Sequence, residues 1–268
     1  MGSLTRTQRQ RAVRLALYAL FVLLVVVFVL VADWEAISSN FFLREGFTET
    51  WQDFVLVGAK NTILYTLIAF VGGFVLALVL VLMRLAPIAP FRWVATAYIE
   101  LFRGLPALVV ILFMAFGVPI AFGGWRPPGG TIGAGLLALM LVAGAYMAET
   151  LRAGIEAVPK GQTEAARSLG MSGGWTMATV VMPQALRIVI PPLTNELVIL
   201  IKDTSLLFVV GMAASEKELT TMARDFMTSG PSAGTATSLI FACLMYLAIT
   251  LPLTRVVAWL ERRQNRSR

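Results

Sequence analysis

Six long apolar runs constrain the fold of this chain more than any other feature of its 268 residues. They lie near residues 15–32, 61–83, 94–120, 131–151, 184–202 and 236–259. A helix needs about 20 mostly apolar residues to cross the hydrocarbon core of a bilayer. Charged residues make up only 14% of the chain, whereas a soluble domain is about a quarter charged. The sequence therefore predicts an all-α integral membrane protein with six transmembrane helices.

The first apolar run follows four arginines, as the core of a signal peptide would. It is longer than the usual apolar core of about 7–15 residues, and no A-x-A cleavage site follows it. We therefore expect a retained helix at 15–32 after a basic segment at 1–14. Residues 33–60 are then an external loop, which five carboxylates in or beside it make acidic: Asp33, Glu35, Glu45, Glu49 and Asp53.

The distribution of Lys and Arg sets the expected orientation, because cytoplasmic segments carry most of the basic residues. If the N-terminus is inside, 16 of the 22 basic residues lie in cytoplasmic segments or adjoining helix ends. The other six lie outside and are Arg44, Lys60, Arg126, Lys202, Lys217 and Arg224. The opposite orientation would place most of the positive charge outside. Both termini, including a basic tail at 263–268, and the polar segment 152–183 are therefore expected in the cytoplasm.

The residue inventory argues against catalysis by this chain. It contains no His, the commonest metal ligand and general base. Its single cysteine, Cys243, lies in an apolar run and has no intramolecular disulfide partner. None of the four Lys residues follows a Gly, so the G-x-x-x-x-G-K-[ST] phosphate-binding loop is absent. The net charge of +7 does not indicate nucleic-acid binding, because the basic residues flank apolar runs instead of forming one stripe.

The polar segment 152–183 predicts two short helices held against the membrane by the fourth and fifth spans. Pro159 and Gly161 break the helix that enters it, and the following residues to Leu169 are good helix formers. Gly170 is a natural helix stop, and Ser172 can cap a second helix. Ala165 and Ala166 give the first helix a low-profile face for a partner groove. The alternative is an ordinary amphipathic loop.

A run of motifs surrounds this segment. They read Y-x-A-E-x-x-R-x-G-I from Tyr146, K-G-Q-x-E-A-A-x-x-L-G from Lys160, P-Q-A-x-R from Pro183, P-P-L-x-N from Pro191 and K-D-T-S-L from Lys202. An E-x-x-R-G-x-P element begins at Glu100. As a set, over about residues 55–262, they resemble the ATP-binding-cassette (ABC) importer permeases that take up polar amino acids such as histidine, arginine, glutamine and glutamate.

The resemblance implies a type I importer permease fold, with a five-helix core in residues 61–262 plus one extra N-terminal helix. It also implies that the EAA loop in 152–183 docks on a separate ATPase. The matching coupling residues are Lys160, Gly161, Glu164, Ala165, Ala166, Leu169, Gly170 and Pro183. The family consensus has Ile and Leu where this chain has Val180 and Met182, and both changes keep an apolar side chain.

By the same resemblance the chain is a transport subunit and not an enzyme. Its implied partners are an ABC ATPase dimer that uses ATP and Mg, a second permease chain, identical or homologous, and an external solute-binding protein. A polar amino acid is the implied cargo, and the bacterial plasma membrane is the implied location. No cofactor is expected on this chain. Glu216 to Ser232 is a polar outer segment that we expect to contact the binding protein.

Ionisable groups inside membrane spans are costly and usually face a cavity or a partner. The candidates for the solute path are Glu100, Arg103, Asn195, Glu196, Lys202 and Asp203. Asn195 and Glu196 follow Pro191-Pro192, which is expected to interrupt the helix. A hydrogen bond between helices is an equal alternative for Glu196. Ion pairs within Glu100–Arg103, Glu149–Arg152 and Lys202–Asp203 are the alternatives for those residues.

Two further alternatives stay open from the sequence. Ala69, Gly73 and Ala77 at four-residue spacing either form a close helix–helix contact or reflect an Ala- and Gly-rich composition. A secondary transporter or channel driven by an ion gradient would also carry charges inside its spans. Such a protein would not need a segment that matches an ATPase-docking pattern, so the importer permease is the favoured interpretation.

Overall fold

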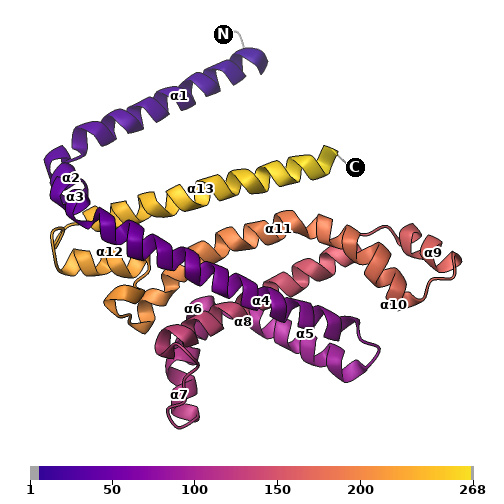
Figure 1. Cartoon of the computed structure of the whole chain (residues 1–268). Coiled ribbons are helices and arrows are strands. Elements are labelled where there is room, and N and C mark those ends of the chain that lie inside the picture. The colour runs from indigo at the N-terminus through magenta and orange to yellow at the C-terminus, as the bar shows by residue number, and fades with distance from the viewer. Residues whose placement is uncertain (1–5, 267–268) are drawn as a thin grey trace.

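The computed structural model describes residues 6–266, and within that range the chain is helical without strands (Figure 1). The long helices are α1 (Arg6–Val31), α4 (Lys60–Leu85), α8 (Gly130–Glu156), α11 (Met182–Asp203) and α13 (Thr237–Arg266). The shorter ones are α2 (Trp34–Phe41), α3 (Arg44–Asp53), α5 (Ala89–Gly104), α6 (Ala107–Leu112), α7 (Val118–Ala121), α9 (Lys160–Ser168), α10 (Gly173–Thr176) and α12 (Leu219–Thr228). Five short π or 3-10 stretches complete the order: η1 (Phe54–Ala59), η2 (Phe113–Gly117), η3 (Met177–Val181), η4 (Thr204–Val210) and η5 (Ala214–Glu216). The outer parts of the predicted basic segments, residues 1–5 and 267–268, lie outside the described range.

Small residues bring α4 and α8 together at the centre of the bundle. Ala69 and Ala77 are fully buried, and a Cβ placed on Gly73 would lie 3.1 Å from the Cβ of Ala143. On α8, a Cβ on Gly144 would lie 2.8 Å from a Leu76 methyl carbon. Such close approach lets dispersion forces hold two helices where no hydrophobic effect drives association. The four-residue spacing on α4 is therefore a helix–helix contact.

The apolar run 94–120 is not one helix, and that expectation was wrong. α5 ends at Gly104 and α6 begins at Ala107, with a bend of 106° between the two halves. Leu105 and Pro106 have extended backbone angles at the break. The physical reason is local: the proline ring disfavours the helical conformation of the residue before it. The bend places α6 against α8 and η4.

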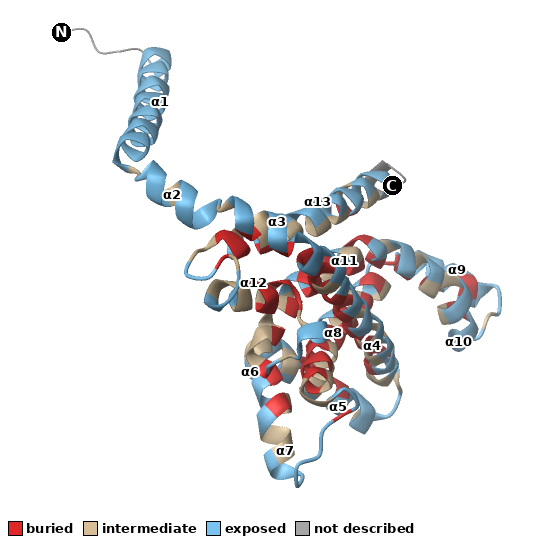
Figure 2. Cartoon of the chain, turned by 60° about the vertical axis from the view of Figure 1, so that its left-hand side comes forward, coloured by how far each residue is buried: buried red, intermediate tan, exposed pale blue. Residues whose placement is uncertain are grey.

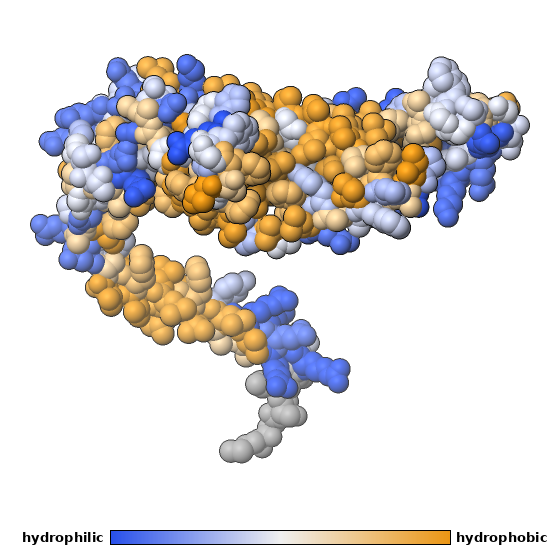
Figure 3. Space-filling model, turned by 90° about the horizontal axis from the view of Figure 1, so that it is seen from below, coloured by the Kyte–Doolittle hydropathy of each residue, from blue (hydrophilic) through white to orange (hydrophobic). Residues whose placement is uncertain are grey.

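The expected count of six spans is not confirmed. Four helical stretches of the described chain are long and apolar enough to cross a membrane, or five if the bent pair counts as one span. α11, which contains the run 184–202, is not among them. The expected interruption at Pro191-Pro192 is also absent, since α11 continues through both prolines. Figure 3 shows a broad apolar zone with hydrophilic side chains gathered toward both ends of the molecule.

The segment between α1 and α4 is helical and not the loop we expected. α1 is exposed along its whole length and extends away from the bundle (Figure 2). The later part of the segment belongs to the fold: Phe54 is fully buried, and its ring centroid lies 4.5 Å from that of Phe241 on α13. Leu43 N–H donates to the hydroxyl of Thr237 at 3.1 Å. The packed body therefore begins before residue 61.

Candidate functional site

The predicted coupling segment forms two short helices, α9 and α10, beyond the ends of α8 and α11 (Figure 1). α9 ends in a Schellman motif, because Met171 N–H donates to Ala166 O at 3.2 Å and Gly170 N–H to Arg167 O at 3.0 Å. Gly170 has φ +82°, which favours glycine. Ser172 caps α10 by accepting from Trp175 N–H at 3.3 Å. The two turn residues therefore act as their local chemistry predicts.

The outer surface of this segment differs in one respect from the prediction. Ala166 is 5% exposed, so it packs inward and is unavailable to a partner groove. Lys160, Gly161, Glu164, Ala165 and Gly170 are exposed, as is Pro183 in the first turn of α11. The large apolar side chains that face outward are Leu169, 84% exposed, and Trp175, 63% exposed. Trp175 was missed at the sequence level, although an apolar ring in a polar segment was the available signal.

Beside this segment, charged side chains join the ends of α4 and α8. Arg84 Nη1 donates to Glu149 Oε2 at 2.7 Å. Arg152 Nε donates to Glu149 Oε1 at 3.1 Å, and a second Arg152 nitrogen pairs with Glu156. The alternative of a Glu149–Arg152 ion pair is thus what the structure contains. Arg84 was missed, because 65 residues separate it from Glu149 in the sequence.

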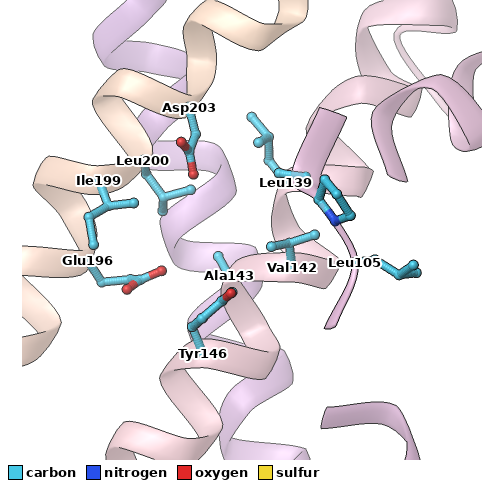
Figure 4. Close-up of a pocket in the computed structure, with 11 residues that line it drawn as sticks. Leu105, Leu139, Val142, Ala143, Tyr146, Glu196, Ile199, Leu200 and Asp203 are labelled. Atoms are coloured by element: carbon cyan, nitrogen blue, oxygen red, sulfur yellow. The ribbon is translucent and has the colours of Figure 1, made fainter. Parts of the chain in front are cut away.

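A cavity of about 330 Å³ lies between α6, α8 and α11, where two carboxylates meet an otherwise mostly apolar wall (Figure 4). Glu196 and Asp203 both line it. Their spacing of seven residues, about two helical turns, puts them on one face of α11. Figure 4 shows the Glu196 carboxylate directed from α11 toward Ala143 and Tyr146 of α8. The cavity can therefore offer anionic oxygens to a cationic group.

The other four solute-path candidates do not line this cavity. Asn195 and Lys202 are exposed on α11. Glu100 is exposed on α5, and the described residues contain no ion pair between it and Arg103 or between Lys202 and Asp203. Both of those alternatives were wrong. Arg103 instead lies over the ring of Tyr146, 5.6 Å from its centroid, and Tyr146 OH donates to Arg103 O at 3.3 Å.

A buried carboxylate that the sequence analysis missed organises the opposite end of the molecule. Glu218 is 0% exposed and caps α12 by accepting from Thr220 N–H at 2.7 Å and Thr221 N–H at 2.6 Å. Tyr246 OH donates to Glu218 Oε2, the oxygen that also accepts from Thr220, at 3.0 Å. Burial raises the pKa of this carboxyl above its usual range, while the hydrogen bonds oppose that rise. The arrangement is a structural cap and ties α12 to α13.

Residues 82–266 match the family described as the binding-protein-dependent transport system inner membrane component. The chain belongs to this family. The matched region contains the α9–α10 segment, the charged cluster and the cavity. As an inner membrane component of an ABC importer, a member of this family leaves ATP hydrolysis to a partner.

Known members of the family are similar to this chain over most of its length. It is 39% identical over 210 residues to the probable glutamine ABC transporter permease protein GlnM of Bacillus subtilis (strain 168), covering 78% of this chain and 93% of that protein. It is 33% identical to the arginine transport system permease protein ArtQ of the same organism, over 78% of this chain and 92% of that protein. The glutamine transport system permease protein GlnP of Escherichia coli (strain K12) is 35% identical over 79% of this chain and 93% of its own length.

Solved structures agree with the fold of this family. A crystal structure of an amino acid ABC transporter with histidines matches with TM-score 0.72 and 34% identity, over 81% of this chain and 96% of that one. A chain of the MetNI methionine ABC transporter in an inward facing conformation matches with TM-score 0.60 and 20% identity, over 80% and 99% of the two chains. The fold is therefore that of a type I ABC importer permease.

Proposed function

We propose that this chain moves a polar amino acid across a bacterial inner membrane, driven by an ATPase dimer that docks on α9 and α10. The observation that carries the proposal is the α9–α10 segment itself. Two capped helices stand beyond the bundle and expose the large apolar side chains of Leu169 and Trp175, which the groove of a partner can bury. Because the chain has no phosphate-binding loop, a separate ATPase must drive its movement, and that ATPase needs a surface on which to dock.

The remaining partners and the orientation follow from the same proposal. A second permease chain and an external solute-binding protein complete the importer. Both termini and α9–α10 face the cytoplasm, supported by the excess of Lys and Arg in those segments. The segment Glu216 to Ser232, at the end opposite α9–α10, then faces the binding protein.

The cavity beside α11 is the part of the solute path that we assign to this chain. An amino acid carries an ammonium group, which needs an anionic partner away from water. Glu196 and Asp203 supply such oxygens, and Tyr146 adds an aromatic wall. The names of the similar permeases, which include glutamine, arginine and glutamate carriers, support a polar amino acid as cargo.

The direct test is to co-purify the chain with its ATPase and binding protein and to measure ATP hydrolysis across a panel of amino acids. We expect one or a few polar amino acids to stimulate hydrolysis and to accumulate in proteoliposomes only when ATP is present. Accumulation driven by an ion gradient without ATP would instead establish the secondary transporter. In the same assay, Glu196→Gln should weaken uptake or change its selectivity, whereas wild-type behaviour would remove Glu196 from the path.

A further inference from the structure

One ion pair crosses between two long helices at the end of the bundle where the α9–α10 segment begins. Arg84 lies in the last turn of α4, and Glu149 lies two turns before the end of α8. Arg84 Nη1 and Glu149 Oε2 are 2.7 Å apart. The two side chains are only 26% and 22% exposed, so water competes for this pair less than it does at an open surface.

Glu149 is held from two sides, which fixes its direction. Its Oε2 accepts from Arg84, and its Oε1 accepts from Nε of Arg152 on the next turn of the same helix at 3.1 Å. Arg152 is itself held by Glu156. A guanidinium binds carboxylates with directional hydrogen bonds. The cluster therefore aims Glu149 at α4, and Arg84 completes it from the other helix.

The contact between α4 and α8 around their glycines is apolar. It is built from Gly72, Gly73 and Gly144 against Met140, Ala143 and Leu76. Dispersion forces between these closely packed groups hold the two helices together, but they involve no charge and no hydrogen bond. The Arg84–Glu149 pair adds a charged, directional hydrogen bond to this apolar contact.

α8 is also the helix that carries the α9–α10 segment. Its last turn packs against α11, where Gly154 makes room for Val189. Val158, Val181 and Ala185 form a small buried cluster that joins the two ends of the segment to α8 and α11. A movement of α9 and α10 therefore reaches α8 and α11 directly through the chain, whereas α4 receives it only through its packing against these helices.

We propose that Arg84 is a positioning residue for transport: its ion pair with Glu149 locks α4 to α8, so that a movement of the α9–α10 segment carries α4 with it. This inference rests on the proposed docking of an ATPase at that segment. It assigns to Arg84 a role in transmitting movement that neither the docking surface nor the cavity supplies.

The test uses the complete importer in proteoliposomes and measures solute taken up per ATP hydrolysed. Arg84→Gln removes the charge and keeps a polar side chain, while Arg84→Lys restores the charge. Arg92→Gln is the matched control, because Arg92 is exposed at the start of α5 and donates only to the backbone oxygens of Ala86 and Pro87. Couplings between protein sites are commonly about 5–150-fold, so we expect Arg84→Gln to lower the uptake-to-hydrolysis ratio about fivefold or more. Arg92→Gln should leave the ratio unchanged, and Arg84→Lys should recover most of it.

A purely structural role would lower uptake and hydrolysis together and leave their ratio at the wild-type value, and that result would overturn the proposal. If Arg84→Gln does not assemble, Glu149→Gln breaks the same pair while keeping a hydrogen-bond acceptor, and the same ratio decides. A second measurement needs no solute. With Cys243→Ala, spin labels at the exposed positions Leu82 and Gln162 report the distance between α4 and α9.

We expect one narrow label distance with and without ATP in the wild-type background, and an ATP-dependent or broadened distance in Arg84→Gln. The same distances in both backgrounds would refute the lock between α4 and α8. Failure of the wild-type complex to take up any amino acid would contradict the proposed function and leave the label distances as the test of this inference.

Discussion

The tight contact between α8 and α11 at Gly154 makes a quantitative prediction about a single methyl group. A Cβ at position 154 would lie 2.1 Å from Val189 Cγ1 and 3.3 Å from the backbone oxygen of Ala185. Carbon atoms prefer separations of about 3.5 Å or more, so the shortfall against the Val189 methyl is about 1.4 Å. Val189 is 1% exposed and β-branched, so it cannot swing away freely. Gly154→Ala should therefore push the two helices apart.

The expected cost follows from the comparison of two substitutions. Overpacking a well-filled contact costs about 1–3 kcal/mol, while Ala in place of Gly stabilises a helix by up to about 1 kcal/mol. Gly161→Ala provides the control, because a Cβ there meets nothing within 4 Å. The difference between the two variants isolates the steric term at about 1–3 kcal/mol. At about 2–4 °C per kcal/mol, Gly154→Ala should unfold roughly 2–12 °C below Gly161→Ala.

Thermal unfolding of the purified detergent-solubilised chain, followed by tryptophan fluorescence, measures this difference. Val189→Ala in the Gly154→Ala background removes the clashing methyl, so the double variant should be more stable than the sum of the single changes predicts. Equal unfolding temperatures for Gly154→Ala and Gly161→Ala would refute the steric argument. Strictly additive effects of the two α8–α11 substitutions would refute it as well.

Three further outcomes follow from the local contacts. Gly170→Val forces a β-branched residue into the left-handed region, at a cost of roughly 1–2 kcal/mol. The variant chain should still insert into the membrane, but the ATPase should no longer co-purify with it and transport should be lost. Asn tolerates the left-handed region, so Gly170→Asn should retain both co-purification and transport. Because burial raises the pKa of Glu218, ionisation opposes folding: its favourable contribution is present below the ordinary carboxyl pKa and is lost as pH rises through the raised value. The unfolding temperature of Glu218→Gln should therefore fall less than that of the wild type as pH rises from the ordinary carboxyl pKa upward. The same fall in both proteins would show that Glu218 does not cause the pH dependence. Tyr65→Phe removes the hydrogen bond to Glu216 O at 2.8 Å and should lower stability by about 0.5–1.5 kcal/mol; no loss in denaturant unfolding would contradict it.

Several elements of the fold follow from local sequence chemistry. The apolar runs anticipated α1, α4, α8 and α13, and Gly170 and Ser172 predicted the end of α9 and the start of α10. The continuous helix expected at 94–120 failed, although Pro106 carried the signal for a break. The helix break expected at Pro191-Pro192 did not occur. α11 packs against α8 and α13, and this packing compensates for the two backbone N–H donors that the prolines lack.

The sequence by itself determined that the chain enters a membrane, where the apolar helices α1, α4, α8 and α13 lie, and which family its motifs match, because hydropathy and turn chemistry act over a few neighbouring residues. Only the tertiary structure decided that Arg84 meets Glu149, that Ala166 faces inward, and that Glu196 and Asp203 share a cavity with Tyr146. Small residues between α4 and α8 bring Arg84 beside Glu149, and the bend at Pro106 puts Pro106 and Ala107 into the wall of that cavity. These contacts join positions far apart in the chain, and no local pattern encodes such a distance.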